Sequence, residues 1–478
     1  MKQPLNESYL MNHARAAQPD AARALPAHSA LLLLALLCGC AYALVRGNSV
    51  NSDEAQKIER GIQNLRELSF KTSVPVIVMT PDQAEQAILE EIGREYTDQQ
   101  LKTEGEAGAM VGLYPRGIDL KAESLKLLKS QIAGFYEPHR KEMILVSGNI
   151  ELGLRDRFAE FLIQRDLAGE MLLAHELTHA LQDQHFEVNQ QLEKLRDDDD
   201  RQLALKSVTE GDATLAGLGY ATGKMNDETV DILVARLEQL PAQFAAQTAG
   251  VPEALSEPLV FQYSAGARFV GEAFHRGGWK AVDELYRNPP QSSQQIMHPA
   301  FYFDHPVLPA AITISGYQQV LPGWEKDSEN SLGALMLQVI LKRNFGPDAP
   351  EVRLADRWAG DRMAVLRKGD SLTILWVVFF RDDRSARRFA IAYGTALDRT
   401  LGAGTAHHLE TRPSTVMAVI GAGANQYAAL GAEVWKAIKI KLPPISAPPA
   451  LRAASGGSSS LDSPGAALAS GSGFVPSR

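Results

Sequence analysis

The chain has 478 residues, 45% of them hydrophobic, and a formal net charge of −9 at pH 7. This length and composition can supply the core of one large domain or of two to three ordinary ones. There is no excess of basic residues to hold a phosphate backbone, which argues against a nucleic acid as a partner.

The N-terminal region has the composition of an export signal. A polar segment, residues 1–28, carries lysine and arginine, and an apolar run, ALLLLALLCGCAYALV, follows it from Ala30 to Val45. The run is shorter than the about 20 apolar residues of a membrane span, and a positive segment before a short apolar core is typical of a signal peptide. We therefore expect a leader over residues 1–45, with an uncleaved signal anchor as the alternative.

Within the leader, the sequence Leu37, Cys38, Gly39, Cys40 resembles the lipobox of bacterial lipoproteins. In that pattern Cys40 is lipidated and becomes the new N-terminus. We therefore expect a lipoprotein of the bacterial cell envelope that is anchored in the membrane through Cys40 and faces the periplasm. Both cysteines of the chain lie here, so the mature domain has no disulfide and no thiolate to bind a metal or to act as a nucleophile.

Hydrophobic spacing predicts a series of short elements in the first part of the folded chain. Apolar residues at helical spacing predict helices, and short apolar runs bounded by Pro or Gly predict strands. The predicted elements are helices over 53–68 and 120–132, a helix that begins at Pro81, a strand over 74–79, and two strands on either side of residues 137–139.

Two longer helices are expected next. Residues 167–184 contain no proline and only Gly169 as a helix breaker, and residues 201–218 have a similar pattern. Between these helices, Asp197 to Asp200 form a run of four acids. The run lacks the alternation and the glycine of a calcium-binding loop, so we favour a solvated loop over a calcium site.

Beyond Ile312, strands and helices alternate. The β-prone run SLTILWVVFFRD, from Ser371, precedes the helical run SARRFAIAYGTAL, and the strand STVMAVIGA precedes the helix NQYAALGAEVWKAIKIK. This pattern predicts a smaller α/β lobe over residues 313–442. The tail, residues 443–478, is rich in Pro, Ala, Ser and Gly and is expected to be disordered.

The stretch AHELTHALQDQHF, residues 174–186, brings three histidines and a glutamate close together. On a helix, His175 and His179 lie one turn apart on the same face, where two imidazoles can bind one divalent ion. Glu176 lies close enough to hold a water molecule without binding the metal itself. This is the His-Glu-x-x-His arrangement of zinc hydrolases. A purely structural helix is disfavoured, because two unpaired buried histidines would be costly.

Two residues are candidates for the third metal ligand. His185 fits the metzincin pattern except that Gln182 replaces the glycine that ends the helix there. If the helix continues, His185 lies about 15 Å along the axis from His175 and is rotated by about 80° from the ligand face. Glu210 lies on the next helix, and Ala213 follows it on the same face, where a small residue allows close helix packing. We favour Glu210 over His185, with a solvated surface acid as the alternative for Glu210.

The stretches GFYEP, HELTHALQDQHF, TEGDAT, FQYSAGARFV and PPQSSQQIMHPAFY together resemble a group of little-characterised bacterial gluzincin-like metallopeptidases of the thermolysin-like superfamily, many of them exported lipoproteins. The resemblance covers roughly residues 132–302. It implies that His175, His179 and Glu210 bind Zn²⁺ and that Glu176 is the base. In that group an acidic residue often occupies the position of Gln294.

The motifs and the predicted elements together suggest an α+β fold. We expect a mainly helical, zincin-like metallopeptidase domain over residues 53–312 with a small antiparallel sheet, and the C-terminal α/β lobe beside it. In zincins of this kind the strand that borders the cleft offers its free edge to an extended peptide. Met143–Val146 is short and follows charged residues, so we expect it to be this edge strand.

A metal held by three protein ligands keeps a fourth position open for water, and Glu176 can take a proton from that water as it attacks a carbonyl. The oxyanion then needs a further donor, for which Tyr263 and His298 are candidates. The alternatives are a packed core aromatic for Tyr263 and a turn cap for His298. We therefore expect a zinc peptidase that acts on peptides or proteins. A zinc hydrolase of another amide bond and a non-catalytic zinc-binding scaffold or chaperone are the alternatives.

Overall fold

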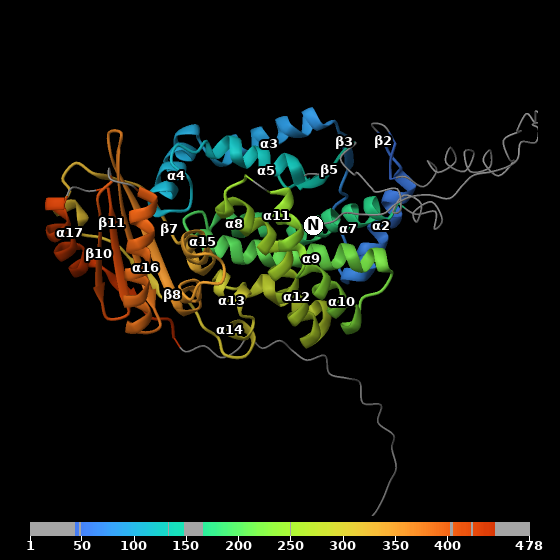
Figure 1. The fold of residues 1–478 in the computed structure, drawn as a ribbon. Coiled ribbons are helices and arrows are strands. Elements are labelled where there is room, and N and C mark those ends of the chain that lie inside the picture. The colour runs from blue at the N-terminus through green and yellow to red at the C-terminus, as the bar shows by residue number, and fades with distance from the viewer. Residues whose placement is uncertain are drawn as a thin grey trace, which may run out of the picture.

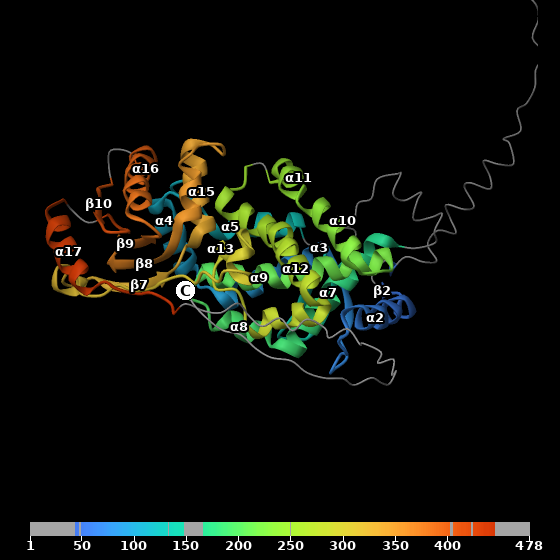
Figure 2. The same ribbon diagram turned by 90° about the horizontal axis from the view of Figure 1, so that it is seen from below.

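The structure is a computed structural model. It describes residues 44–444 with the exception of 47–48, 132, 148–165, 249, 402–404 and 422–423. The predicted lipobox, nearly all of the predicted leader and nearly all of the predicted tail lie outside the described residues. Figures 1 and 2 show an elongated molecule, with a five-stranded sheet at one end and helix α2, Ser52–Arg66, at the other.

The helical part of the molecule surrounds α7, Leu167–Phe186, which carries the His-Glu-x-x-His motif. This helix is apolar on most sides, and Leu173, Leu177 and Leu181 lie in the core. It packs against α9, Asp199–Thr222, and α9 packs against the long α12, Glu253–Arg287. A helix that is apolar on nearly all sides is stable only when its neighbours bury it, and α7 is buried in this way.

The other helices of this part pack against α7, α9 or α12 or against neighbouring elements. Helix α2 begins at the cap Asn51, and α3 begins after Thr80 with a reciprocal capping box to Gln83. Their bounds are α3 Pro81–Glu95, α4 Asp98–Val111, α5 Leu120–Gln131, α8 Val188–Glu193, α10 Asp227–Leu237, α11 Leu240–Gln247, α13 Ser293–Met297 and α14 Ala300–Phe303.

The run of four acids is not the solvated loop expected from the sequence. Asp198 caps the N-terminus of α9 through the amide of Arg201, and Asp199 already belongs to the helix. Asp200 is buried and accepts a hydrogen bond from the amide of Ser293 at 3.0 Å. Acidic side chains are favourable at a helix N-terminus, where the amides are unpaired, and this explains why the acids gather here.

A three-stranded sheet lies beside α7, with the strand order β3, β5, β4. Strand β5, Glu142–Val146, pairs in parallel with β3, Val76–Met79, and antiparallel with β4, Gly134–Glu137. The sheet is therefore mixed rather than antiparallel. The prediction that Met143–Val146 offers a free edge is wrong, because β5 is paired on both sides. A separate pair, β1 Val45–Arg46 and β2 Ser49–Val50, precedes α2.

The five-stranded sheet is antiparallel throughout, with the strand order β10, β11, β9, β8, β7. Alternate residues of β9 enter two different cores, Trp376 on one face and Leu375 and Val377 on the other. Helices α15, Gly333–Phe345, and α16, Asp383–Leu401, cover the first face, and α17, Ala424–Ala437, covers the second. The strands are β7 Glu325–Asn330, β8 Trp358–Lys368, β9 Ser371–Phe380, β10 His407–Arg412 and β11 Thr415–Ile420.

The end of α17 differs from the sequence prediction. The helix expected to reach Lys441 ends at Ala437, and Lys439–Lys441 form strand β12. This strand pairs with β6, Ala311–Thr313, and so joins the two ends of the C-terminal lobe. Two 3₁₀ turns complete the lobe, η2 Tyr317–Gln319 and η3 Val352–Arg357. The β-branched Ile440 fits a strand better than a helix.

The α+β class predicted from the sequence is confirmed, with a mainly helical part and a lobe that contains the larger sheet. The two parts share one core. Ala107 and Val111 of α4 belong to the same buried cluster as Ile374 and Trp376 of β9 and Leu337 of α15. Among the described residues, no helix is both long enough and apolar enough to cross a membrane.

Candidate metal centre

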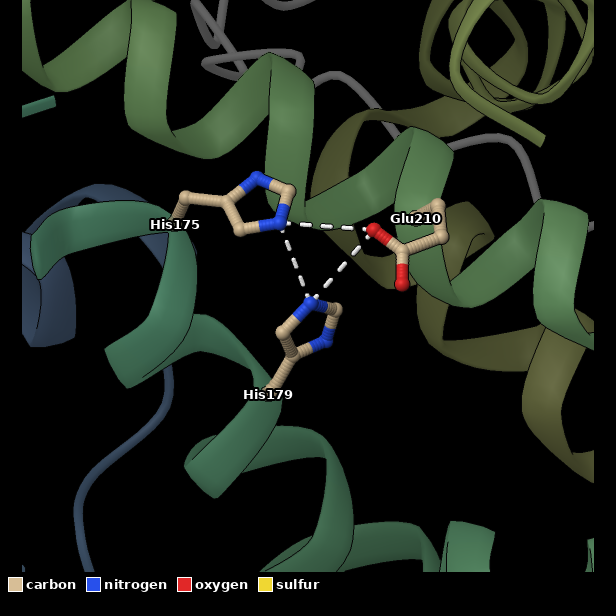
Figure 3. Close-up of side chains that lie close together, drawn as sticks. All are labelled: His175, His179 and Glu210. Carbon is tan, nitrogen blue, oxygen red and sulfur yellow. Dashed lines mark hydrogen bonds and ion pairs between the residues drawn. The ribbon is translucent and has the colours of Figure 1, made fainter. Parts of the chain in front are cut away.

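Helices α7 and α9 bring His175, His179 and Glu210 together, and Figure 3 shows the three side chains pointing toward one another. The Nε2 atoms of the two histidines are 3.1 Å apart. Oε2 of Glu210 lies 3.3 Å from Nε2 of His175 and 3.6 Å from Nε2 of His179. Two imidazole nitrogens and one carboxylate oxygen therefore converge on one point, which is the donor set of a zinc site of the His₂Glu type.

The third histidine of the motif lies elsewhere because α7 does not end at Gln182. The helix continues to Phe186 and ends at Glu187, which has a left-handed backbone with a φ of 52°. His185 therefore lies in the last turn, where its Nε2 is 2.8 Å from the carbonyl of Ser69. The structure thus brings Glu210, and not His185, to the other two histidines.

Glycines allow the helices around the cluster to pack closely. A Cβ atom at Gly217 would lie 2.9 Å from the carbonyl oxygen of Met171 and 3.2 Å from the Cβ of His175, so α9 touches α7 at the motif. Added Cβ atoms at Gly211 or Gly266 would lie 2.4 Å or less from the backbone of the opposite helix, α12 or α9. Ala213 is buried as expected, but these glycines provide the closest approaches.

The residues present fit a divalent metal ion. Oε2 of Glu210 is buried and has no hydrogen-bond donor among the described groups, although it faces the two imidazoles. Burial disfavours a charged imidazole, but the carboxylate of Glu210 outweighs this effect and raises the pKa of His179 to about 10. The same pairing lowers the pKa of Glu210 against the effect of its burial. A cation is therefore favoured at this position, and a proton on His179 takes that place in the metal-free protein.

Glu176, the predicted base, lies beside the three converging side chains. Glu176 is 7% exposed, and its Oε2 accepts a hydrogen bond of 3.0 Å from the backbone amide of Tyr136 in β4. The carboxylate also acts electrostatically on His179 and Tyr263. One oxygen of Glu176 is thus fixed by the sheet, and no sequence motif predicted this contact with Tyr136.

Tyr263 of α12 lies at the cluster, and its ring stacks on His175 with the centroids 6.1 Å apart. Burial raises the pKa of its hydroxyl well above 10, and the carboxylates of Glu210 and Glu176 add to this rise. Tyr263 therefore stays protonated and can act as a donor at this site.

His298, the other predicted donor, is placed differently. It follows α13, and its Nε2 is 3.2 Å from Oδ1 of Asp356 in the C-terminal lobe. No contact described in the structure joins His298 to the metal cluster. Gln294 also faces the C-terminal lobe: its amide donates to the carbonyl of Trp358 at 2.9 Å and accepts from Arg381 at 2.6 Å. An acid at position 294 could accept from Arg381 but could not donate to Trp358.

Further residues support the candidate metal ligands from behind, and no sequence motif had indicated them. Nδ1 of His179 is 2.9 Å from Oε1 of Gln182, and Nε2 of Gln182 is 3.1 Å from Oδ2 of Asp212. Residues three apart on a helix share a face, so the spacing of His179 and Gln182 is a signal that the sequence contains. The contact with Asp212 is between helices and has no local signal.

Comparisons with known proteins give one family match and one structural neighbour for this chain. Residues 318–430 match a family described as a domain of unknown function, DUF8575. A crystal structure from Chloroflexus aurantiacus, described as "a putative hydrolase with a novel fold", is similar at 17% sequence identity and a TM-score of 0.32, over 57% of this chain and 95% of that chain. No curated protein matches the chain significantly. Neither match is to a gluzincin, so that resemblance rests on the sequence motifs alone.

Proposed function

We propose that this protein is a zinc-dependent peptidase of the bacterial cell envelope, held at the membrane through a lipidated Cys40. The observation that carries the proposal is the convergence of His175, His179 and Glu210, with the carboxylate of Glu176 beside them. A site that served structure alone would have no use for a buried carboxylate next to three metal ligands.

The chain's own residues supply the remaining parts of a hydrolytic site. Bound zinc would supply Lewis-acid chemistry that makes water a nucleophile at neutral pH. Glu176 takes a proton from the attacking water and passes it to the leaving amine, as a C–O bond forms and the C–N bond breaks. Because the Tyr136 amide holds one oxygen of Glu176, the other is available for this transfer. Tyr263 keeps its proton and can donate to the carbonyl oxygen.

Strand β4 supports a peptide as the substrate. In the described part of the chain β4 pairs only with β5, so its other edge faces away from the sheet. The amide of Tyr136 points to that side, since it bonds to Glu176. An extended peptide that pairs with this edge through its main chain would place a carbonyl beside Glu176. A hydrolase of a different amide would not require such an edge.

Zinc content and peptide cleavage, measured on the same set of variants, test the proposal. We expect the full chain to bind about one zinc ion and to cleave members of a peptide library. Glu210→Ala should lose most of the zinc, whereas His185→Ala should keep it. Glu176→Gln should keep the zinc and lose cleavage by about 10²-fold or more.

Three results would contradict the proposal. If His185→Ala empties the site and Glu210→Ala does not, the metzincin-like ligand set is correct. If Glu176→Gln cleaves peptides as well as wild type, Glu176 is not the base. If wild type binds zinc but cleaves no peptide, the non-catalytic scaffold or the hydrolase of another amide bond is favoured, and non-peptide amides separate these two.

A further inference from the structure

A buried hydrogen-bond network lies behind the metal cluster and begins at the amide side chain of Gln182. Oε1 of Gln182 is 2.9 Å from Nδ1 of His179, the ring nitrogen that faces away from Glu210. Nε2 of Gln182 donates to the carbonyl of Thr209 at 3.0 Å and to Oδ2 of Asp212 at 3.1 Å. Gln182 thus contacts the backbone of Thr209, which precedes Glu210 in the chain, and the side chain of Asp212, which follows it.

These partners allow only one orientation of the Gln182 amide. The carbonyl of Thr209 and the carboxylate of Asp212 can only accept hydrogen bonds, so the NH₂ group of Gln182 must face them. Its oxygen must then face His179. Since this oxygen can only accept, Nδ1 of His179 carries a proton, and Nε2 is the ring nitrogen left to bind a metal.

Several further hydrogen bonds hold the end of the network that lies away from the metal cluster, at Asp212. Asp212 accepts from Nε of Arg66 at 2.8 Å and from the hydroxyl of Tyr286 at 2.7 Å, and Arg66 also bonds to Asp283 at 2.9 Å. Arg66, Asp212 and Gln182 are each no more than 1% exposed. The network joins α2, α7, α9 and α12, so rotation of the Gln182 side chain would break several buried hydrogen bonds at once.

We infer that Gln182 is a positioning residue for the metal site. It fixes the tautomer and the ring orientation of His179 and holds the ligand-bearing helices α7 and α9 in register. The inference rests on the proposed function, since it assumes that His179 binds a metal. The group that holds the metal-binding His179 is thus a neutral amide. Its NH₂ group donates a hydrogen bond to the buried Asp212.

Two substitutions at Gln182 separate positioning from mere packing. Gln182→Met keeps the size but loses the acceptor for His179 and both donors. Gln182→Glu keeps the acceptor for His179 but turns a carboxylate toward Asp212. We expect Gln182→Met to weaken Zn²⁺ binding by about 10- to 100-fold, measured by competition with a chromophoric chelator. Gln182→Glu should keep tighter Zn²⁺ binding than Gln182→Met, but its metal-free form should unfold at the lower temperature.

Gln184→Met is the matched control. Gln184 lies on the same helix and bonds through its amide to Lys71 and Thr72, away from the metal cluster. Its Zn²⁺ affinity should stay within about twofold of wild type. The absorption spectrum of the Co²⁺-loaded protein should change in Gln182→Met and stay unchanged in Gln184→Met.

The two Gln182 variants are compared in Zn²⁺ affinity and in unfolding temperature, and their order in each quantity tests the inference. If the variant with the lower unfolding temperature also binds Zn²⁺ more weakly, Gln182 acts through stability alone and the inference is overturned. A folded Gln182→Met protein with wild-type Zn²⁺ affinity would overturn it as well. If wild type binds no Zn²⁺, the proposed function fails first, and the measurement on wild type shows this before the variants are compared.

Discussion

At the scale of single residues, His179 and Glu210 form a partly buried ion pair in the metal-free protein. The pKa of His179 is raised from 6.5 to about 10, and that of Glu210 is lowered. A raised pKa on a base stabilises the folded state at a pH below its unfolded value. The contribution of His179 is therefore complete below about pH 6.5 and is lost as the pH rises through about 10. The contribution of Glu210 is lost only in acid.

The raised pKa of His179 predicts how the stability of the metal-free protein depends on pH. In the presence of a chelator, the unfolding temperature of wild type should fall between pH 7 and pH 10. His179→Gln should flatten this fall, because the titrating group is gone. His185→Gln removes a histidine from the same helix that has no carboxylate partner in the cluster, and it should keep the wild-type slope. Equal slopes for wild type and His179→Gln would show that the pair does not titrate in this range.

The sequence predicted only part of the site at this scale. His175, Glu176 and His179 lie within one helical turn of each other, so their spacing alone brings them together. Glu210 required a choice between two candidates, which the length of α7 explains: the helix runs past Gln182 and carries His185 away. The contact of Glu176 with β4 could not be predicted, because it joins segments that only the folded chain brings together.

At the scale of elements, the crossing of α9 and α12 sets the position of Tyr263 next to Glu210. The Cβ of an alanine at position 266 would lie 2.2 Å from the carbonyl oxygen of Ser207. We expect Gly266→Ala to push the helices apart and to lower the free energy of unfolding by about 1–3 kcal/mol. Urea titration measures the change.

Gly93→Ala is the control for this prediction. Gly93 lies in the exposed part of α3, and nothing lies within 4 Å of an added Cβ. The substitution should therefore raise the free energy of unfolding by up to about 1 kcal/mol, as alanine favours a helix over glycine. If Gly266→Ala also raises the free energy of unfolding, the close approach of α9 and α12 leaves room for an added Cβ and the prediction is wrong.

Most helices and strands could be predicted from local patterns, but the partners of the strands could not. The periodicity of α2, α7 and α9 and the Pro81 start of α3 gave elements close to those observed. The short apolar run of β5 is equally compatible with an edge and with a centre. Only the pairing with β3, about 65 residues earlier in the chain, decides between them.

At the scale of the whole molecule, the helical part and the C-terminal lobe depend on each other for burial. Ala107, Val111 and Leu113 are buried in one cluster with residues of α15, β9 and α16. A fragment that ends at residue 312 would expose these residues and part of α9. We expect this fragment to lack a cooperative thermal transition, while the chain from 44 to 444 unfolds cooperatively. A fragment that melts cooperatively and binds zinc would show that the lobe is dispensable for folding.

The network behind the metal cluster also bears on how the site forms during folding. Arg66 and Asp212 are 146 residues apart in the chain, and Arg66 and Asp283 are 217 apart. Contacts of such long sequence separation close large loops and form slowly. The two histidines become neighbours as soon as α7 forms, but the complete set of ligands with its support exists only once these distant segments have met. If the proposed function holds, tight metal binding is acquired late, and it marks a chain that has completed its fold.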